Sequence, residues 1–122
     1  MLWDVNKNQK ITQIPHRRDY DTWTARLSKD QTSRIKEEIN SLIAGDEIKT
    51  AGWIPGENWM GTPFQAISET ACRSDREASG KCFGLFVWVT LMEREDYWGF
   101  GKYSKNDIPI QSMTYFRVYP QL

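Results

Sequence analysis

The chain has 122 residues, of which 39% are hydrophobic and 26% charged, and this balance is typical of a globular protein with one core. Its 16 basic and 16 acidic residues cancel, so it lacks the net positive field of most nucleic-acid binders, and we expect no nucleic-acid partner. No segment resembles a secretory leader or reaches the length of a membrane span, which predicts a single cytoplasmic domain, residues 1–122, without a membrane partner.

The N-terminal third begins with two expected short strands, at Leu2–Val5 and Lys10–Ile14, on either side of a polar turn. Tyr20, Trp23 and Leu27 then recur at helical spacing and predict a short helix or turn with an aromatic side. We expect this aromatic side to join the core.

The next segment carries the clearest helix signal of the chain. Ser28 and Gln31 have the spacing of a capping box, in which each side chain bonds the other's backbone N–H, and Gly45 closes the segment. Apolar residues recur on one face, which predicts an amphipathic helix lying on a core. They are Ile35, Ile39, Leu42 and Ile43.

The middle of the chain is expected to hold a strand, a loop and a second helix. A strand over Glu47–Ile54 is followed by a loop rich in Gly and Pro at 55–61. Thr62, Pro63 and Gln65 then fit the first turn of a helix, because proline lacks only an N–H that is unpaired there. Its expected buried stripe is Phe64, Ile67 and Ala71.

The C-terminal part is predicted to be mainly β. A further helical turn over Ser74–Gly80 precedes Cys82–Met92, which reads as a strand buried on both faces. Tyr97–Tyr103 is expected to return antiparallel to it, and Met113–Tyr119 to form another strand. The predicted fold class is α+β: an antiparallel sheet with a C-terminal meander and two or three helices packed on one face.

The two faces of this predicted sheet differ in composition. We expect the face that receives the helices to include Trp98, Phe100, Phe116 and Val118. The opposite face is rich in tyrosine and arginine, which is typical of a protein interface. It predicts a homodimer, although a cover formed by the N-terminal strands or a small-molecule site would also account for it. The candidate interface residues are Tyr97, Tyr103, Tyr115, Arg117 and Tyr119.

The loop before the second helix is the most unusual local feature. Trp53 and Trp59 around a Pro-Gly turn can wall a pocket in which Glu57 orients a polar or cationic ligand, with Trp88 as a further ligand-binding candidate. The alternative, which we favour, is a tryptophan-rich lid on the core.

Residues for catalysis or metal binding show no recognisable spacing. His16, Glu57 and Glu69 fit no known acid-base motif, and we expect no metal and no cofactor. Cys72 and Cys82 are expected to be reduced structural thiols, since the end of a helix should raise the pKa of Cys72 and an apolar strand should bury Cys82.

Three blocks carry a resemblance to a known family. They are Trp53-Ile54-Pro55-Gly56-Glu57-Asn58-Trp59-Met60-Gly61-Thr62-Pro63-Phe64, Phe83-Gly84-Leu85 through Trp88, and Thr114-Tyr115-Phe116-Arg117. Over Asp19 to Pro120 the chain resembles uncharacterised proteins of bacterial integron gene cassettes. The resemblance implies a small, soluble bacterial protein encoded on a mobile element, and it transfers no catalytic residue.

Together these features predict a non-enzymatic binding module, acting as a homodimer, that engages a small molecule or a protein partner through the aromatic sheet face or the tryptophan loop. The alternative is a small enzyme that uses Glu57 in an aromatic-lined cleft.

Overall fold

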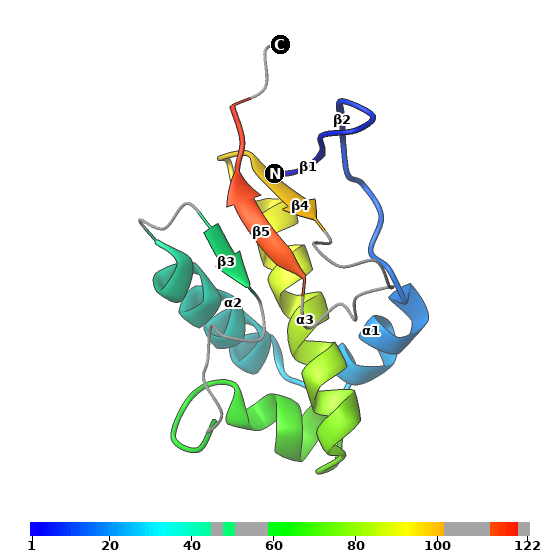
Figure 1. Cartoon of the computed structure of the whole chain (residues 1–122). Helices are drawn as coiled ribbons and strands as arrows, with labels where there is room; N and C mark the ends of the chain where they lie inside the picture. Colours follow the sequence, from blue (N-terminus) through cyan, green and yellow to red (C-terminus); the bar gives the residue numbers. More distant parts are fainter. Residues whose placement is uncertain (45–47, 51–58, 102–112, 120–122) are drawn as a thin grey trace.

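The structure is a computed structural model that describes residues 1–44, 48–50, 59–101 and 113–119. Helices and a sheet form two layers, with the helices on one side of the sheet (Figure 1). This arrangement confirms the mixed α and β content that the sequence predicts. The strands are β1 (Leu2–Asp4), β2 (Gln9–Lys10), β3 (Ile48–Thr50), β4 (Trp98–Gly101) and β5 (Thr114–Arg117), and the helices are α1 (Arg17–Thr24), α2 (Lys29–Ile43), the π-helix η2 (Ile67–Ala71) and α3 (Arg76–Glu93).

Over the described ranges the sheet has five strands in the order β2-β1-β4-β5-β3. The neighbouring pairs β1–β2, β4–β5 and β3–β5 are antiparallel, but β1 and β4 run parallel, with Leu2 opposite Trp98. The prediction of an antiparallel meander is therefore wrong in part, because the N-terminal strand inserts beside β4. No local sequence pattern encodes that pairing, since the two strands lie far apart in the chain.

The segment predicted as the central strand, Cys82–Met92, is a helix. It belongs to α3, which begins where the Asp75 side chain accepts a hydrogen bond from the Ala78 N–H at 3.1 Å. α3 contacts α1, α2, η2 and β1, and residues Cys82–Leu91 are all buried. A helix surrounded on every side has no polar face, so its sequence resembles that of a buried strand.

The two helices before β3 match their predictions. Ser28 and Gln31 form the capping box, with the Gln31 N–H donating to Ser28 Oγ at 3.0 Å and the Ser28 N–H to Gln31 Oε1 at 2.9 Å. Ile35, Ile39 and Ile43 of α2 are buried against the core. In the preceding helix, α1, Tyr20 is buried and Trp23 packs on the core cluster.

The predicted helix after Thr62 is replaced by turns and the short π-helix η2. Phe64, Ile67 and Ala71 are buried as expected. Thr62 Oγ1 accepts from the Phe64 N–H at 3.2 Å, while Gln65 Oε1 accepts from the Gly61 N–H at 3.0 Å instead of closing a capping box with Thr62.

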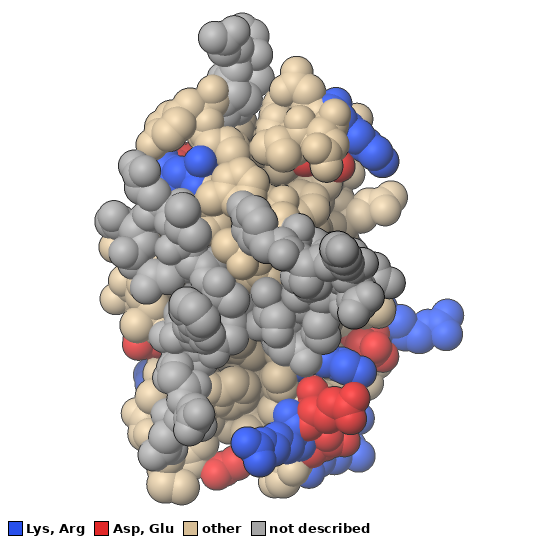
Figure 2. All heavy atoms as spheres, viewed as in Figure 1, with Lys and Arg blue, Asp and Glu red and all other residues tan. Residues whose placement is uncertain are grey.

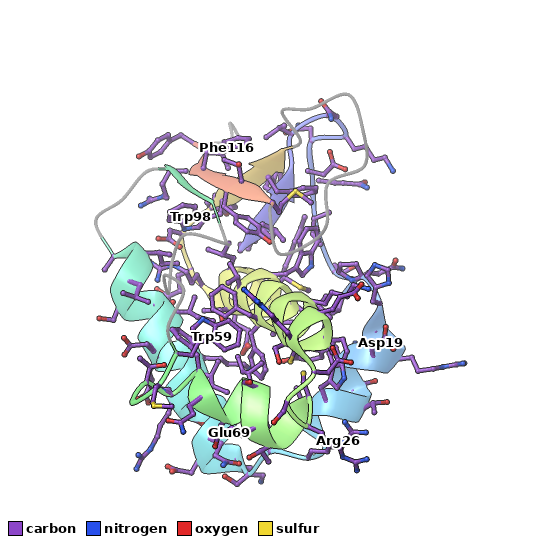
Figure 3. The ribbon with its side chains drawn as sticks, turned by 60° about the horizontal axis from the view of Figure 1, so that its bottom comes forward. Asp19, Arg26, Trp59, Glu69, Trp98 and Phe116 are labelled. Carbon is purple, nitrogen blue, oxygen red and sulfur yellow. The ribbon has the colours of Figure 1, made fainter. Side chains whose placement is uncertain are left out.

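The two faces of the sheet are assigned by its register. Trp98 and Tyr115 are each 1% exposed and lie on the helix-facing side, whereas Phe116 points away from the helices (Figure 3). Trp98 and Phe100 were correctly expected on the helix side, but Phe116 and Val118 lie on the outer side, and Tyr115 takes their place. The alternation of β5 side chains between the two faces of the sheet was therefore predicted correctly. The prediction was wrong about which of these side chains share a face with Trp98 and Phe100 of β4.

Candidate functional site

A groove of about 430 Å³ lies between α3 and the segment that connects β2 to α1. Figure 1 shows this segment running along one side of the sheet toward α1. The groove is concave and of a size that small ligands occupy. Its lining comprises Asp4, Lys7, Gln9, Lys10, Ile11, Thr12, Gln13, Ile14, Pro15 and Trp88.

Trp88 forms a rigid wall of this groove, hereafter the Trp88 groove. Its Nε1–H donates to the carbonyl oxygen of Gln13 at 3.1 Å. Its ring also contacts Phe100, with 4.8 Å between ring centroids, and Tyr115, with 6.5 Å. The side chain is 6% exposed, so a hydrogen bond and two aromatic contacts hold the indole in one orientation.

The β1–β2 turn supplies the charges of the Trp88 groove. Asp4 Oδ1 accepts from the N–H groups of Asn6 at 3.0 Å and Lys7 at 3.1 Å, which is the geometry of an Asx turn. Asp4 is therefore committed to the turn. Within the described residues the ammonium groups of Lys7 and Lys10 form no ion pair or hydrogen bond, and both residues are exposed. The groove thus presents two unpaired cations beside an aromatic wall.

A second cavity, of about 540 Å³, lies where the ends of α2 and α3 approach the turn into β4. Asp96 is the centre of its hydrogen-bond network: it accepts from Arg94 Nε and Nη2, each at 2.8 Å, and from Trp98 Nε1 at 3.0 Å. The hydrogen bonds from Arg94 hold the pKa of Asp96 below its ordinary value. The cavity is lined by Lys36, Asn40, Thr90, Glu93, Arg94, Glu95 and Asp96.

Most of the charged side chains that line this second cavity form ion pairs or hydrogen bonds with one another. Lys36 pairs with Glu93 at 2.6 Å, and Arg94 Nη1 donates to Asn40 Oδ1 at 2.7 Å. The backbone carbonyls of Arg94 and Asp96 accept from the amino group of Met1. A ligand would have to displace these contacts, so the cavity acts as a structural junction that joins α2, α3 and β4.

The predicted tryptophan loop is described only in part. Trp53 and Glu57 lie outside the described residues, as does Tyr103 of the expected interface. Trp59 packs on the core, with ring centroids 6.2 Å from Phe64 and 5.6 Å from Phe83. This packing is the arrangement expected of a lid.

The other expected interface residues do not share one exposed surface. Tyr115 is a core side chain that burial shields from any second copy, and burial also raises its pKa. Arg117 lies 5.6 Å from the ring centroids of both Trp98 and Tyr119 and 3.6 Å from Asp96, so its contacts are within its own chain. Tyr97 packs edge-on against Trp3, whereas Tyr119 is 73% exposed.

Charged side chains on the face seen in Figure 2 gather over α1 and the beginning of α3, where both signs are interleaved. Two of the ion pairs there are Arg17–Asp21 at 3.1 Å and Lys81–Glu77 at 3.5 Å. Pairs of this kind, on exposed helix surfaces, contribute little to stability and leave no concentrated positive field.

The structure describes two of the acid-base candidates. His16 is exposed just before α1, and Glu69 accepts a hydrogen bond from Gln65.

Cys72 and Cys82 are free and buried. A hydrogen bond with the Cys82 side chain is the largest cause of a lowered pKa for Cys72, while the same interaction and burial raise the pKa of Cys82. The expectation that a helix end raises the pKa of Cys72 is therefore wrong. Cys82 lies in α3, not in a strand.

Sequence reasoning found Trp88 but missed the groove it lines. The wall opposite Trp88 is formed by the largely polar segment from Asp4 to Gln13. The sequence analysis interpreted this segment only as two strands and a turn. Within the described ranges no cluster of His, Cys, Asp and Glu has the arrangement of a metal site, and none of the described helices is long and apolar enough to cross a bilayer.

Comparisons of the chain with protein-family models, with curated proteins and with solved structures gave no match. The resemblance to integron cassette proteins therefore stays a prediction, and a function can be inferred only from the geometry of the site.

Proposed function

We propose that the protein is a binding module that takes a small anionic ligand with a planar ring in the Trp88 groove. The observation that carries the proposal is that the fixed Trp88 indole lines the same groove as Lys7 and Lys10, which have no ion-pair partner among the described residues. A ring can pack against the part of the indole that lines the groove while the anionic group of the ligand pairs with Lys7 or Lys10.

The rigidity of the site supports binding of such a ligand. Trp88 keeps one orientation through Gln13, Phe100 and Tyr115, so little conformational entropy is lost when a ligand packs against it. Asp4 is held by two backbone N–H groups, and its single negative charge is outnumbered by the two lysines of the groove, so the groove favours an anionic ligand.

The test uses indole-3-acetate as the probe and its neutral amide, indole-3-acetamide, as the matched ligand. We expect indole-3-acetate to shift the Trp88 indole N–H resonance in NMR titrations and to bind more tightly than the amide. The double variant Lys7→Gln/Lys10→Gln should weaken binding of the acid about tenfold and leave binding of the amide unchanged.

The control variant is Lys29→Gln, because Lys29 is an exposed lysine outside the groove, at the start of α2. It should bind both probes like the unmodified protein. Equal affinities for acid and amide, or shifts confined to indoles other than Trp88, would contradict the proposal.

A second candidate function is self-association through the outer face of the sheet. Phe116 and Val118 lie on this face over Gly99, and Tyr119 beside them is 73% exposed. The described helices all lie on the opposite side (Figure 3). An apolar sheet surface of this kind is suited to a two-fold contact with a second copy.

Light scattering tests self-association. We expect a dimer mass for the unmodified protein and a monomer mass for Phe116→Lys, with native circular dichroism in both. Ser33→Lys, which adds the same charge at an exposed position of α2, should remain dimeric. A monomer mass for the unmodified protein at high micromolar concentration would refute the candidate.

A further inference from the structure

The Trp88 groove follows one edge of the sheet. Among the described strands β2 is the last in the order, with β1 on one side and no strand on the other. Beyond β2 the chain continues from Ile11 to Ile14 without a turn or a bend, and Figure 1 shows it running from the sheet toward α1. Residues 9–15 all line the groove, so one of its walls is a single, largely extended stretch of chain.

The hydrogen bonds of this segment show which of its backbone groups face outward. The Ile11 N–H donates to the carbonyl of Leu2 at 2.8 Å, so the backbone of Ile11 faces β1. Because this direction alternates along an extended chain, the backbone N–H and carbonyl groups of Lys10 and Thr12 face away from β1. Both residues are exposed, and within the described ranges no hydrogen bond reaches the Thr12 N–H. The edge therefore offers donors and acceptors to a further strand.

The side chains of the segment alternate between the two faces of the sheet. Ile11 packs against the core on the helix side, so Lys10, which pairs with Trp3, has its side chain on the outer side. Trp88 belongs to α3 and lies on the helix side. A strand added at this edge would direct one side chain toward Trp88 and the next toward Lys10.

The charge of the groove decides between the possible occupants of the edge. Lys7 and Lys10 have no ion-pair partner among the described residues, and Asp4 is the one acidic residue of the lining. A second copy of the chain, paired edge to edge, would bring these lysines close to the same lysines of its partner, and like charges repel. An acidic peptide would instead place carboxylates opposite them, so charge complementarity favours the peptide.

We propose that the anionic ligand of the Trp88 groove is a short acidic peptide that adds to the sheet as an extended strand beside β2. This inference rests on the proposed function, because an aromatic side chain of the peptide is the planar ring and the neighbouring carboxylates are the anionic groups. Backbone hydrogen bonds to Lys10 and Thr12 give affinity, while Trp88 and the lysines select alternating aromatic and acidic residues.

The length of the edge sets the length of the peptide. The extended chain from Gln9 to Ile14 spans about 20 Å, which corresponds to a bound segment of about five or six residues. The probe is therefore the pentapeptide acetyl-Glu-Phe-Glu-Phe-Glu-amide, and its matched neutral form has Gln in place of each Glu. We expect the acidic peptide to bind about tenfold more tightly than the neutral one. The amide protons of Lys10 and Thr12 should gain protection from hydrogen exchange when it binds.

Two N-methylated forms of the acidic pentapeptide test strand addition directly. One carries methyl groups on the nitrogens of both Phe residues, and the other on those of the second and third Glu residues, so each form blocks one edge of the peptide. Because only one edge of an added strand faces β2, one form should lose about tenfold or more in affinity and the other should bind like the parent peptide. Equal losses, or no loss in either form, would overturn the proposal.

Thr12→Pro tests the same contact from the side of the protein, since proline has no N–H to donate. It should weaken binding of the pentapeptide about tenfold and leave binding of indole-3-acetate unchanged. Thr12→Ala keeps the N–H and should bind both probes like the unmodified protein. Circular dichroism checks that the variants fold, and the methylated peptides decide the question on the unmodified chain even if the proline variant does not.

The two probes separate the peptide inference from the proposed function. If indole-3-acetate binds in the Trp88 groove but the pentapeptide does not bind, the peptide inference fails and the proposed function stands. If neither probe binds, both fail.

Discussion

The backbone of Gly99 in β4 lies directly beneath the ring of Phe116 in β5: a Cβ at position 99 would stand 2.5 Å from Phe116 Cε2, 2.8 Å from Cζ and 3.0 Å from Cγ1 of Val118. Carbon atoms do not approach so closely, so the absence of a side chain at Gly99 is what allows Phe116 to cover the strand.

We therefore expect Gly99→Ala to destabilise the protein by about 1 to 3 kcal/mol, because the Phe116 ring must move away from the sheet. Denaturant unfolding measures the effect. Combining Gly99→Ala with Phe116→Ala should give a smaller loss than the sum of the two single losses, since the smaller side chain leaves space for the methyl group. An additive double variant would contradict this account.

Asp96 should give the protein a specific acid sensitivity. Its pKa is lowered in the folded state, chiefly by the hydrogen bonds from Arg94, so its stabilising effect is complete above the ordinary aspartate pKa of about 4 and is lost as the pH falls through the lowered value. Asp96→Asn should destabilise by about 2 kcal/mol near neutral pH and by progressively less below about pH 4. Unfolding free energies measured across this range check the prediction.

The matched control for Asp96 is Asp30→Asn. Asp30 also pairs with an arginine, at 3.0 Å from Arg34, but its side chain is 73% exposed, and solvent screens such pairs. We expect its pH profile to follow that of the unmodified protein. A similar change of profile in both variants would show that the Arg94 contacts are not the cause.

Trp59→Ala should destabilise the protein by about 3 kcal/mol, because the indole packs against both Phe64 and Phe83 on the core. Val5→Ala, at a side chain that is 46% exposed, should change stability by no more than about 0.5 kcal/mol. Thermal and denaturant unfolding distinguish the two. A loss at Trp59 as small as that at Val5 would mean that the indole covers a pocket instead of the core.

Trp88→Phe should cost about 1 kcal/mol, since phenylalanine keeps most of the contact with Phe100 but cannot donate to the Gln13 carbonyl. The loss should appear in denaturant unfolding. A larger loss would mean that the ring of Phe repacks, and an unchanged stability would mean that the hydrogen bond to Gln13 contributes nothing.

Short-range sequence patterns predicted the elements whose structure depends on residues close together in the chain. Ser28 and Gln31 encode the start of α2 because a capping box needs only neighbouring residues, and the apolar spacing then fixes its buried face. The same holds for the short helix around Tyr20. Trp88 was found as a candidate site residue because a tryptophan in an apolar run is conspicuous.

The remaining features depend on contacts between distant parts of the chain. The sequence of α3 resembles that of a strand because helices and sheet bury Cys82–Leu91 on all sides, and the helix that Asp75 caps continues far beyond the single turn expected over Ser74–Gly80. Which face of β5 meets the helices depends on Tyr115 packing against Trp88, and the lowered pKa of Cys72 depends first on Cys82 and to a smaller extent on Arg26. None of these pairs is visible as a spacing in the sequence.

The position of β1 bears on how the chain is synthesised. Leu2 is fully buried between β2 and β4, and its parallel partner is Trp98. During translation Leu2 and Trp3 emerge early but cannot be covered by the sheet until β4 has left the ribosome, so the order of synthesis opposes the order of pairing. The β1–β2 hairpin therefore remains without its parallel partner until β4 has been synthesised, so the sheet cannot close around Leu2 while only the N-terminal half of the chain has emerged.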